Sequence, residues 1–116
     1  EQFPQIARYR DTPTGSLSGG ERQMLGFCRG LVMEPALLLV DEPSIGLAPS
    51  LIAQTMRTIS GIRDRFNVTI LIVEQNVRAA LGITGRVYLL SAGRIIHEEQ
   101  TVDAGTESRL RDLFLR

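Results

Sequence analysis

Apolar residues recur in the first third of the chain at a spacing near 3.6 residues, which is typical of a helix with one buried face. The pattern covers residues 18 to about 34, and its apolar positions are Met24, Leu25, Cys28, Leu31 and Val32. Ser18 and Glu21 form a Ser-x-x-Glu capping box, in which each side chain accepts a hydrogen bond from the other residue's backbone amide. Pro35 predicts the end of this helix.

Two apolar runs of strand length surround a second helical pattern. The first run, residues 36–40, is apolar at every position, which predicts a strand covered on both faces, as in a parallel sheet. A helix is expected from Pro49 to about Phe66, with a buried stripe made of Ile52, Met56, Ile59, Ile62 and Phe66. The second run, residues 68–73, then completes a βαβ unit with a right-handed crossover.

The rest of the chain predicts smaller elements. A three-residue turn, Ser91-Ala92-Gly93, is expected to join two antiparallel strands, with Gly93 in the left-handed conformation. The strands are expected at residues 86–90 and 94–97, with a short helix before them at 76–81 and an amphipathic helix after them at 106–115, its inward residues being Leu110, Leu113 and Phe114. The predicted fold class is α/β, layered, with mainly parallel strands and a C-terminal β-hairpin.

The composition is ordinary for a globular protein and excludes several classes. Of the 116 residues, 43% are hydrophobic and 22% are charged, and 13 basic side chains balance 13 acidic ones. This neutral balance argues against a nucleic-acid partner, which usually requires a basic excess. The single cysteine, Cys28, excludes an internal disulfide and is expected to be a small buried core residue. No apolar run approaches the roughly 20 residues that span a bilayer, and the start has no signal-peptide pattern.

Two glycines follow the capping serine at the start of the first predicted helix. The sequence there is Leu17-Ser18-Gly19-Gly20-Glu21-Arg22-Gln23. Free backbone amides and the positive end of the helix dipole favour an anion at such a helix start, and glycine lets the anion approach closely. The alternative is a plain capping box whose end is open to solvent. Each glycine costs the helix about 1 kcal/mol, so some compensating role is expected.

Acidic and polar residues follow both predicted parallel strands. Asp41 and Glu42 come directly after the first strand, at the sheet edge where open α/β sheets bind ligands. Adjacent carboxylates repel one another, and a hard cation such as Mg²⁺ would relieve that repulsion. The alternative is a pair of exposed loop acids. Glu74-Gln75-Asn76 follows the second strand at the same edge, but strand ends are often polar, so this signal alone is weak.

In combination, these motifs resemble those of the ATP-binding cassette (ABC) ATPases. The segment 17–23 is similar to the family's signature motif, 37–42 to its Walker B strand, and Ser44-Ile45-Gly46-Leu47 to its D-loop. The order is that of the family, and the resemblance covers residues 3 to about 100. Gly46-Leu47-Ala48-Pro49 and Val73-Glu74-Gln75-Asn76 look most like ATPase subunits of branched-chain amino-acid or urea uptake systems.

The resemblance implies a nucleotide-binding role for the signature motif. Ser18, Gly19 and Gly20 would contact the γ-phosphate of ATP bound to the opposite subunit of a dimer. Gln23, at the end of the motif, would also belong to the nucleotide-binding set.

The resemblance also implies catalytic roles after the strands. Asp41 would hold Mg²⁺ through water, and Glu42 would be the base that orients or activates the attacking water. Gln75 takes the place of the switch residue, which is histidine in most members of the family. Glutamine can hydrogen-bond a phosphate oxygen but carries no positive charge. The only histidine, His97, lies elsewhere and is expected to be a surface strand residue.

The chain contains no Gly-x-x-x-x-Gly-Lys-[Ser/Thr] sequence, the P-loop that cradles phosphates in this family. The resemblance therefore implies a partial P-loop NTPase-like fold that lacks the Walker A half. Its parts would be 1–34, the end of the helical subdomain with the signature helix; 35–100, the Walker B α/β core; and 101–116, a C-terminal helix. Alone, the chain is expected not to hydrolyse ATP. Its uncovered strand edges predict a dimer, a swapped arrangement or a marginally stable fold.

By resemblance, the expected function is an ATP-binding and ATP-hydrolysing part of a transporter, most like those that import branched-chain amino acids. The implied partners are a second ATP-binding subunit and transmembrane permease subunits, on the cytoplasmic face of the cell membrane. Two alternatives are a catalytically silent module that acts through its dimer surface, and half of a DNA-repair or chromosome-structure ATPase. The absence of long coiled-coil flanks and the neutral charge disfavour the last of these.

Overall fold

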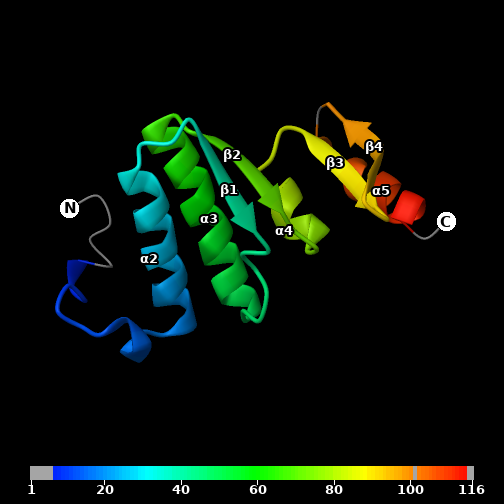
Figure 1. Cartoon of the computed structure of the whole chain (residues 1–116). Helices are drawn as coiled ribbons and strands as arrows, with labels where there is room; N and C mark the ends of the chain where they lie inside the picture. The colour runs from blue at the N-terminus through cyan, green and yellow to red at the C-terminus, as the bar shows by residue number, and fades with distance from the viewer. Residues whose placement is uncertain (1–6, 101, 115–116) are drawn as a thin grey trace. The chain divides into compact units, whose positions relative to one another are not determined.

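A computed structural model of the chain describes residues 7–100 and 102–114 (Figure 1). It divides into two compact units, the first ending at Val73 and the second beginning at Glu74. The α/β class is confirmed: the structure has a small parallel sheet and an antiparallel hairpin, both accompanied by helices. Over the described ranges, no helix has both the length and the apolar character needed to cross a membrane.

The first unit contains the predicted βαβ arrangement. A 3₁₀ turn, η1 (Thr14–Ser16), precedes α2 (Gly19–Val32), and then follow β1 (Leu37–Asp41), α3 (Pro49–Phe66) and β2 (Thr69–Val73). β1 and β2 pair in parallel, in register from Leu37 opposite Thr69 to Asp41 opposite Val73. Figure 1 shows the two strands running in the same direction, with α3 as the connection between them. Pro49 begins α3, and Asn67 ends it in the left-handed conformation, a common helix stop.

Among the described residues of the first unit, helices cover one face of the parallel sheet and leave the other open. Leu38 and Val40 of β1 face inward, and a Cβ placed on Gly30 of α2 would lie 3.0 Å from the Leu38 side chain, so the helix packs closely on this face. The opposite face carries four half-exposed or exposed apolar side chains: Leu37, Leu39, Leu71 and Val73. Within the described residues of the first unit, the prediction that the first strand is covered on both faces is therefore wrong, because the helices cover one face and leave these side chains exposed.

The core of the first unit is built mainly by α3. Met56, Ile59 and Ile62 are 4%, 2% and 2% exposed, which confirms the centre of the predicted stripe. The stripe predicted for α2 is partly wrong. Phe27 is its buried side chain, whereas Val32 is 79% exposed. Val32 lies five positions after Phe27, which is a rotation of roughly 140° around a helix, so the two cannot share one face.

Cys28 lies on α2 and is half-buried rather than fully buried. Its partial removal from water raises the pKa of its thiol. Burial thus disfavours the thiolate, the reactive form of a cysteine. This agrees with the predicted role of Cys28 as a packing residue, although its burial is less complete than expected.

The second unit contains α4 (Val77–Leu81), β3 (Val87–Ser91), β4 (Arg94–Glu99) and α5 (Thr106–Phe114). The strands pair antiparallel, as predicted, and β4 extends two residues beyond the predicted end. Leu110 of α5 is 2% exposed, which confirms its inward position. The side chain of Phe114 lies outside the described residues.

A charged cluster joins β4 to the segment around α5. Arg109 donates from Nε to Glu99 Oε1 at 2.8 Å and also lies 3.1 Å from an Asp103 carboxylate oxygen. Arg109 holds the pKa of Glu99 below its usual range, with His97 as a further contributor. His97 Nε2 lies 3.3 Å from Glu99 Oε1. The histidine is thus half-buried on a strand, where it belongs to a structural ion-pair cluster.

The turn between β3 and β4 has two residues rather than the three predicted. Ser91 pairs directly with Arg94, so only Ala92 and Gly93 lie between the strands. Both have positive φ, 47° and 75°, as in a type I′ turn, whose twist matches that of the flanking strands. The left-handed Gly93 is confirmed. Ala92 is strained, because its Cβ is disfavoured in this region.

Replacing Ala92 by glycine is expected to raise the free energy of unfolding by about 0.5–1 kcal/mol. Relief of strain at positive φ is worth roughly 1–2 kcal/mol and exceeds the added entropy of glycine in the unfolded chain. Urea unfolding would measure the change. Ala104→Gly, at an exposed position without positive φ, is the matched control and should instead lower stability. Equal losses in both variants would contradict strain at Ala92.

Candidate functional site

The capping box predicted at the start of α2 is present. Ser18 is the N-cap residue, and its hydroxyl accepts a hydrogen bond from the Glu21 amide at 3.4 Å. The Glu21 carboxylate accepts from the Ser18 amide at 2.8 Å. The Arg22 guanidinium folds back and donates to the Leu17 carbonyl. The local sequence thus fixes the position at which the helix begins and the direction in which its first amides point.

Neither glycine of the first turn is required by local packing. A Cβ added to Gly19 or Gly20 would meet no atom within 4 Å. Both residues have ordinary negative φ, so the backbone does not require glycine either. A cavity of about 220 Å³ adjoins this helix start, and Ser18 and Gly20 line it together with Thr55 and Thr58 of α3. The glycines therefore leave open space at the positive end of a helix.

The Glu21 carboxylate links the helix start to the segment before it. The Tyr9 hydroxyl is the largest cause of a lowered pKa at Glu21, and the Ser18 backbone amide is the next. Because the folded-state pKa lies below its ordinary value of 4.5, this stabilisation is complete above that value and is lost as pH falls through the folded-state pKa. The capping box should therefore weaken only in acid.

Glu21→Gln is expected to reduce the loss of thermal stability between about pH 5 and pH 3, because it removes one carboxylate whose pKa is lowered by folding. The melting temperature of both proteins, measured across this window by circular dichroism, would test it. Tyr9→Phe removes the largest cause of the shift and should give an intermediate slope. If Glu21→Gln showed the same slope as the parent, the carboxylate would contribute no pH-dependent stability.

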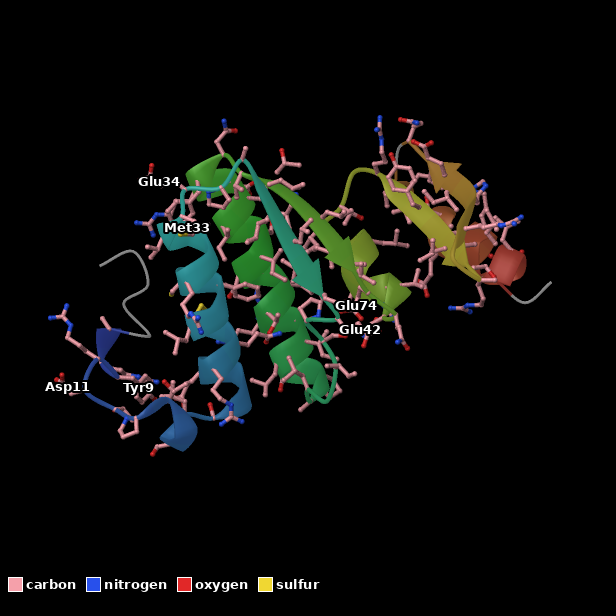
Figure 2. All side chains as sticks on the ribbon, viewed as in Figure 1. Tyr9, Asp11, Met33, Glu34, Glu42 and Glu74 are labelled. Carbon is pink, nitrogen blue, oxygen red and sulfur yellow. The ribbon has the colours of Figure 1, made fainter. Side chains whose placement is uncertain are left out.

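Asp41 and Glu42 lie at the carboxyl end of the parallel sheet, as predicted. Asp41 is the last residue of β1, opposite Val73, and is exposed. Glu42 follows directly, and Figure 2 shows it just past the tip of β1. Its amide donates to the Val73 carbonyl at 2.8 Å, so the backbone at Glu42 is tied to the end of β2.

The backbone at Glu42 is strained. Its φ is +42°, a left-handed value that is uncommon for a residue with a side chain and is further disfavoured before a proline such as Pro43. Strain of this kind costs on the order of 1–3 kcal/mol and is concentrated at functional sites. The bond from the Glu42 amide to Val73 helps to hold this conformation. The structure thus fixes the point from which the Glu42 carboxylate projects.

The residues after Glu42 form two consecutive turns. The Ile45 amide donates to the Glu42 carbonyl at 3.1 Å, and the Leu47 amide donates to the Ser44 carbonyl at 3.2 Å. Gly46 has φ +70°, a value that glycine adopts without strain. Ser44 is buried, whereas Ile45 is 71% exposed. The loop therefore presents an apolar side chain outward from a fixed backbone.

Gln23 connects α2 to this loop and to α3. Its side-chain Nε2 donates to the Pro43 carbonyl, and its Oε1 accepts from the Thr55 hydroxyl at 3.3 Å. Thr55 is 9% exposed and lies beside Met56 in the core. Sequence reasoning missed Thr55. A polar residue beside the apolar stripe of α3 is a signal that could have identified it.

Glu74, Gln75 and Asn76 lie at the start of the second unit. The Asn76 side chain accepts from the Ala79 amide at 3.1 Å and so caps α4, which explains why this helix begins at Val77. The Glu74 carboxylate accepts from the Asn76 amide at 2.9 Å. Gln75 is exposed and follows the last residue of β2 by two positions. Its role as the switch residue stays a prediction.

Asp41 is suited to bind magnesium only if water and substrate phosphates supply the other ligands. Among the described residues, no group of three or more histidine, cysteine, aspartate or glutamate side chains could hold a metal. Mg²⁺ typically keeps several waters and takes one or two carboxylates together with substrate phosphates. An exposed aspartate at a strand end is compatible with that arrangement. It could not hold the ion tightly by itself.

The sequence of this chain is similar to those of several known proteins. A family model described as ABC transporter matches residues 2–45. The branched-chain amino-acid transport ATP-binding protein BraG of Pseudomonas aeruginosa is 42% identical over 99% of this chain and 49% of its own length. The lipopolysaccharide export ATP-binding protein LptB of Acidithiobacillus ferridurans is 36% identical over 91% of this chain and 44% of its own.

Structural comparison leads to the same family. A crystal structure of a nucleotide-free ATP-binding cassette from an ABC transporter superposes with a TM-score of 0.83 at 25% identity, over 96% of this chain and 43% of that one. The chain thus spans about half the length of the curated relatives that it matches. Its sequence, its fold and the order of its motifs identify the chain as part of the ATP-binding domain of the ABC transporter family.

Proposed function

We propose that this chain supplies the signature helix and the Walker B residues of an ATP-hydrolysing transporter subunit. The observation that carries the proposal is the backbone at Glu42, which is held at a strained, positive φ at the carboxyl end of a parallel strand, directly after Asp41. Backbone strain is concentrated at functional sites, and Glu42 combines it with the sheet edge at which α/β folds bind ligands.

In the proposed reaction, water attacks the γ-phosphorus of ATP, and the bond from that phosphorus to the β–γ bridging oxygen breaks. The Glu42 carboxylate orients the attacking water and accepts its proton, which is general base catalysis. Asp41 would hold Mg²⁺ through water, and the ion would neutralise charge on the transferring phosphoryl group. Gln75 would hydrogen-bond a phosphate oxygen, the only contribution that its neutral amide can make.

The start of α2 would stabilise negative charge on a second nucleotide. Its first-turn amides and the positive end of the helix dipole favour the γ-phosphate of ATP held by an opposite subunit. Gly19 and Gly20 support this role, because nothing in the described chain requires glycine at either position. Each glycine lowers helix stability by about 1 kcal/mol, a cost that binding can offset.

The transported substrate is proposed to be a branched-chain amino acid. This rests on the 42% identity to BraG, which exceeds the 36% identity to LptB, and on the two motifs at 46–49 and 73–76. Export of lipopolysaccharide is the second candidate, supported by the LptB match. In either case the proposed partners are a second ATP-binding subunit and membrane permease subunits, with this chain on the cytoplasmic side.

The experiment compares the chain alone with a chimeric cassette, in which the chain is joined to the part of BraG that it does not match. Mg-ATP binding and phosphate release are measured for both proteins. The chimeric cassette is expected to bind and to turn over ATP, whereas the chain alone should do neither at a measurable rate. ATP turnover by the chain alone would overturn the proposal that hydrolysis requires the other half of the cassette. A folded chimeric cassette that is inert would favour the silent interaction module.

A further inference from the structure

The Gln23 side chain lies between the two functional segments of the first unit. It projects from the second turn of α2, whose first turn carries Gly19 and Gly20. Its amide nitrogen donates to the carbonyl of Pro43, the residue directly after Glu42, and its amide oxygen accepts from the Thr55 hydroxyl. Both polar ends of the amide thus engage partners within this unit.

These contacts assign the amide a definite orientation. A carbonyl can only accept and a hydroxyl here donates, so the nitrogen must face Pro43 and the oxygen must face Thr55. Thr55 belongs to the buried core of α3, which gives the link a rigid support. Pro43 is buried as well. The Gln23 amide is therefore a direct connection from α2 to the Pro43 carbonyl and to α3.

We infer that Gln23 is a positioning residue, which holds the backbone turn after Glu42 in a fixed relation to the anion-binding start of α2. This rests on the proposed function and changes the expected role of Gln23 from a nucleotide contact to an internal link. Residues 18–20 would contact one nucleotide, and Glu42 would act on another. The hydrogen bonds of Gln23 would therefore couple nucleotide binding at the start of α2 to the position of the backbone turn after Glu42. The connection from the start of α2 to the turn after Glu42 consists of one helix turn, the Gln23 side chain and the Pro43 peptide group.

The discriminating variant is Gln23→Glu, which keeps the shape of the side chain and an acceptor for Thr55 but replaces the donor to Pro43 with an oxygen. Gln23→Met removes both hydrogen bonds at similar volume and avoids a new charge. Gln54→Glu makes the same chemical change at an exposed position of α3 and is the matched control. Circular dichroism of all three confirms that they are folded before any comparison.

The first measurement uses the chain alone and does not depend on ATP. Amide hydrogen exchange by NMR reports the bond from the Ile45 amide to the Glu42 carbonyl. Exchange at Ile45 is expected to become about tenfold faster in both Gln23 variants, the loss expected from one supporting hydrogen bond, and to stay unchanged in Gln54→Glu. Exchange at Ile59 in the core should not change. Unaltered exchange at Ile45 in both Gln23 variants would overturn the inference.

The second measurement uses the chimeric cassette and separates positioning from binding. Gln23→Glu is expected to lower kcat about tenfold or more while KM for ATP stays within about twofold, because the turn is displaced but nucleotide contacts persist. A raised KM with unchanged kcat would make Gln23 a ligand contact and overturn the inference. If the parent chimeric cassette is inert, the proposed function fails, and exchange at Ile45 still decides whether Gln23 positions the turn.

Discussion

Ile59→Ala is expected to lower the free energy of unfolding by about 2–5 kcal/mol, a large share of the stability of a chain of this size. Ile59 is 2% exposed at the centre of α3, between Met56 and Ile62, which are similarly buried. The loss combines the transfer free energy of the removed carbons with the cost of the cavity that they leave. Urea unfolding followed by circular dichroism, at low micromolar protein concentration, would measure it.

Leu39→Ala is the matched control for this experiment. Leu39 is a large aliphatic residue in the same unit, but it lies on the open face of the sheet and is 67% exposed. Its truncation should change stability by about 0.5 kcal/mol or less, as is usual for surface positions. Equal losses for Leu39 and Ile59 would contradict this expectation and would show that the open face of the sheet is covered in solution.

Local sequence signals explain why the starts of the two long helices, α2 and α3, were predictable. The Ser18 and Glu21 pair satisfies first-turn amides by itself, and Pro49 has its φ preset for a helix start. Each of these signals acts within three or four residues and requires no knowledge of the rest of the fold. The same holds for Asn76, whose side chain caps α4.

Burial could not be predicted as well, because it depends on what packs against an element. The apolar residues Leu37 and Leu39 show that β1 needs a cover on its outer face, but not whether this chain contains that cover. The choice between Phe27 and Val32 on α2 likewise depends on which side of the helix meets the sheet. Both errors arise from tertiary context, which periodicity alone does not contain.

The position of the candidate residues at the strand end was predictable, but their connections to the rest of the unit were not. Asp41 and Glu42 were identified from their place after an apolar run, and the structure puts them at the end of β1. The positive φ of Glu42 has no local sequence signal, since a proline follows it and disfavours that conformation. The bridge from Gln23 to Pro43 joins residues 20 positions apart, beyond the reach of any local pattern.

Glu42→Gln in the chimeric cassette is expected to lower phosphate release by about 10²–10⁴-fold, the usual contribution of general base catalysis. The substitution keeps the size of the side chain, and an amide can still hydrogen-bond the attacking water. It cannot accept the proton that the water must lose. ATP binding should stay within about threefold, because the change removes a group that acts mainly in the transition state. Phosphate release and equilibrium nucleotide binding measure the two quantities separately.

Glu34→Gln provides a control with matched chemistry and backbone. Glu34 also has positive φ, 46°, and it precedes β1 whereas Glu42 follows it, as Figure 2 shows. If glutamine merely disturbed a strained glutamate position, both variants would lose activity together. Loss only at Glu42, with nucleotide binding retained, would assign the effect to the carboxylate at the carboxyl end of the sheet. Full turnover in Glu42→Gln would remove the base from the proposed mechanism, and a purely structural reason for the strain at Glu42 would then be required.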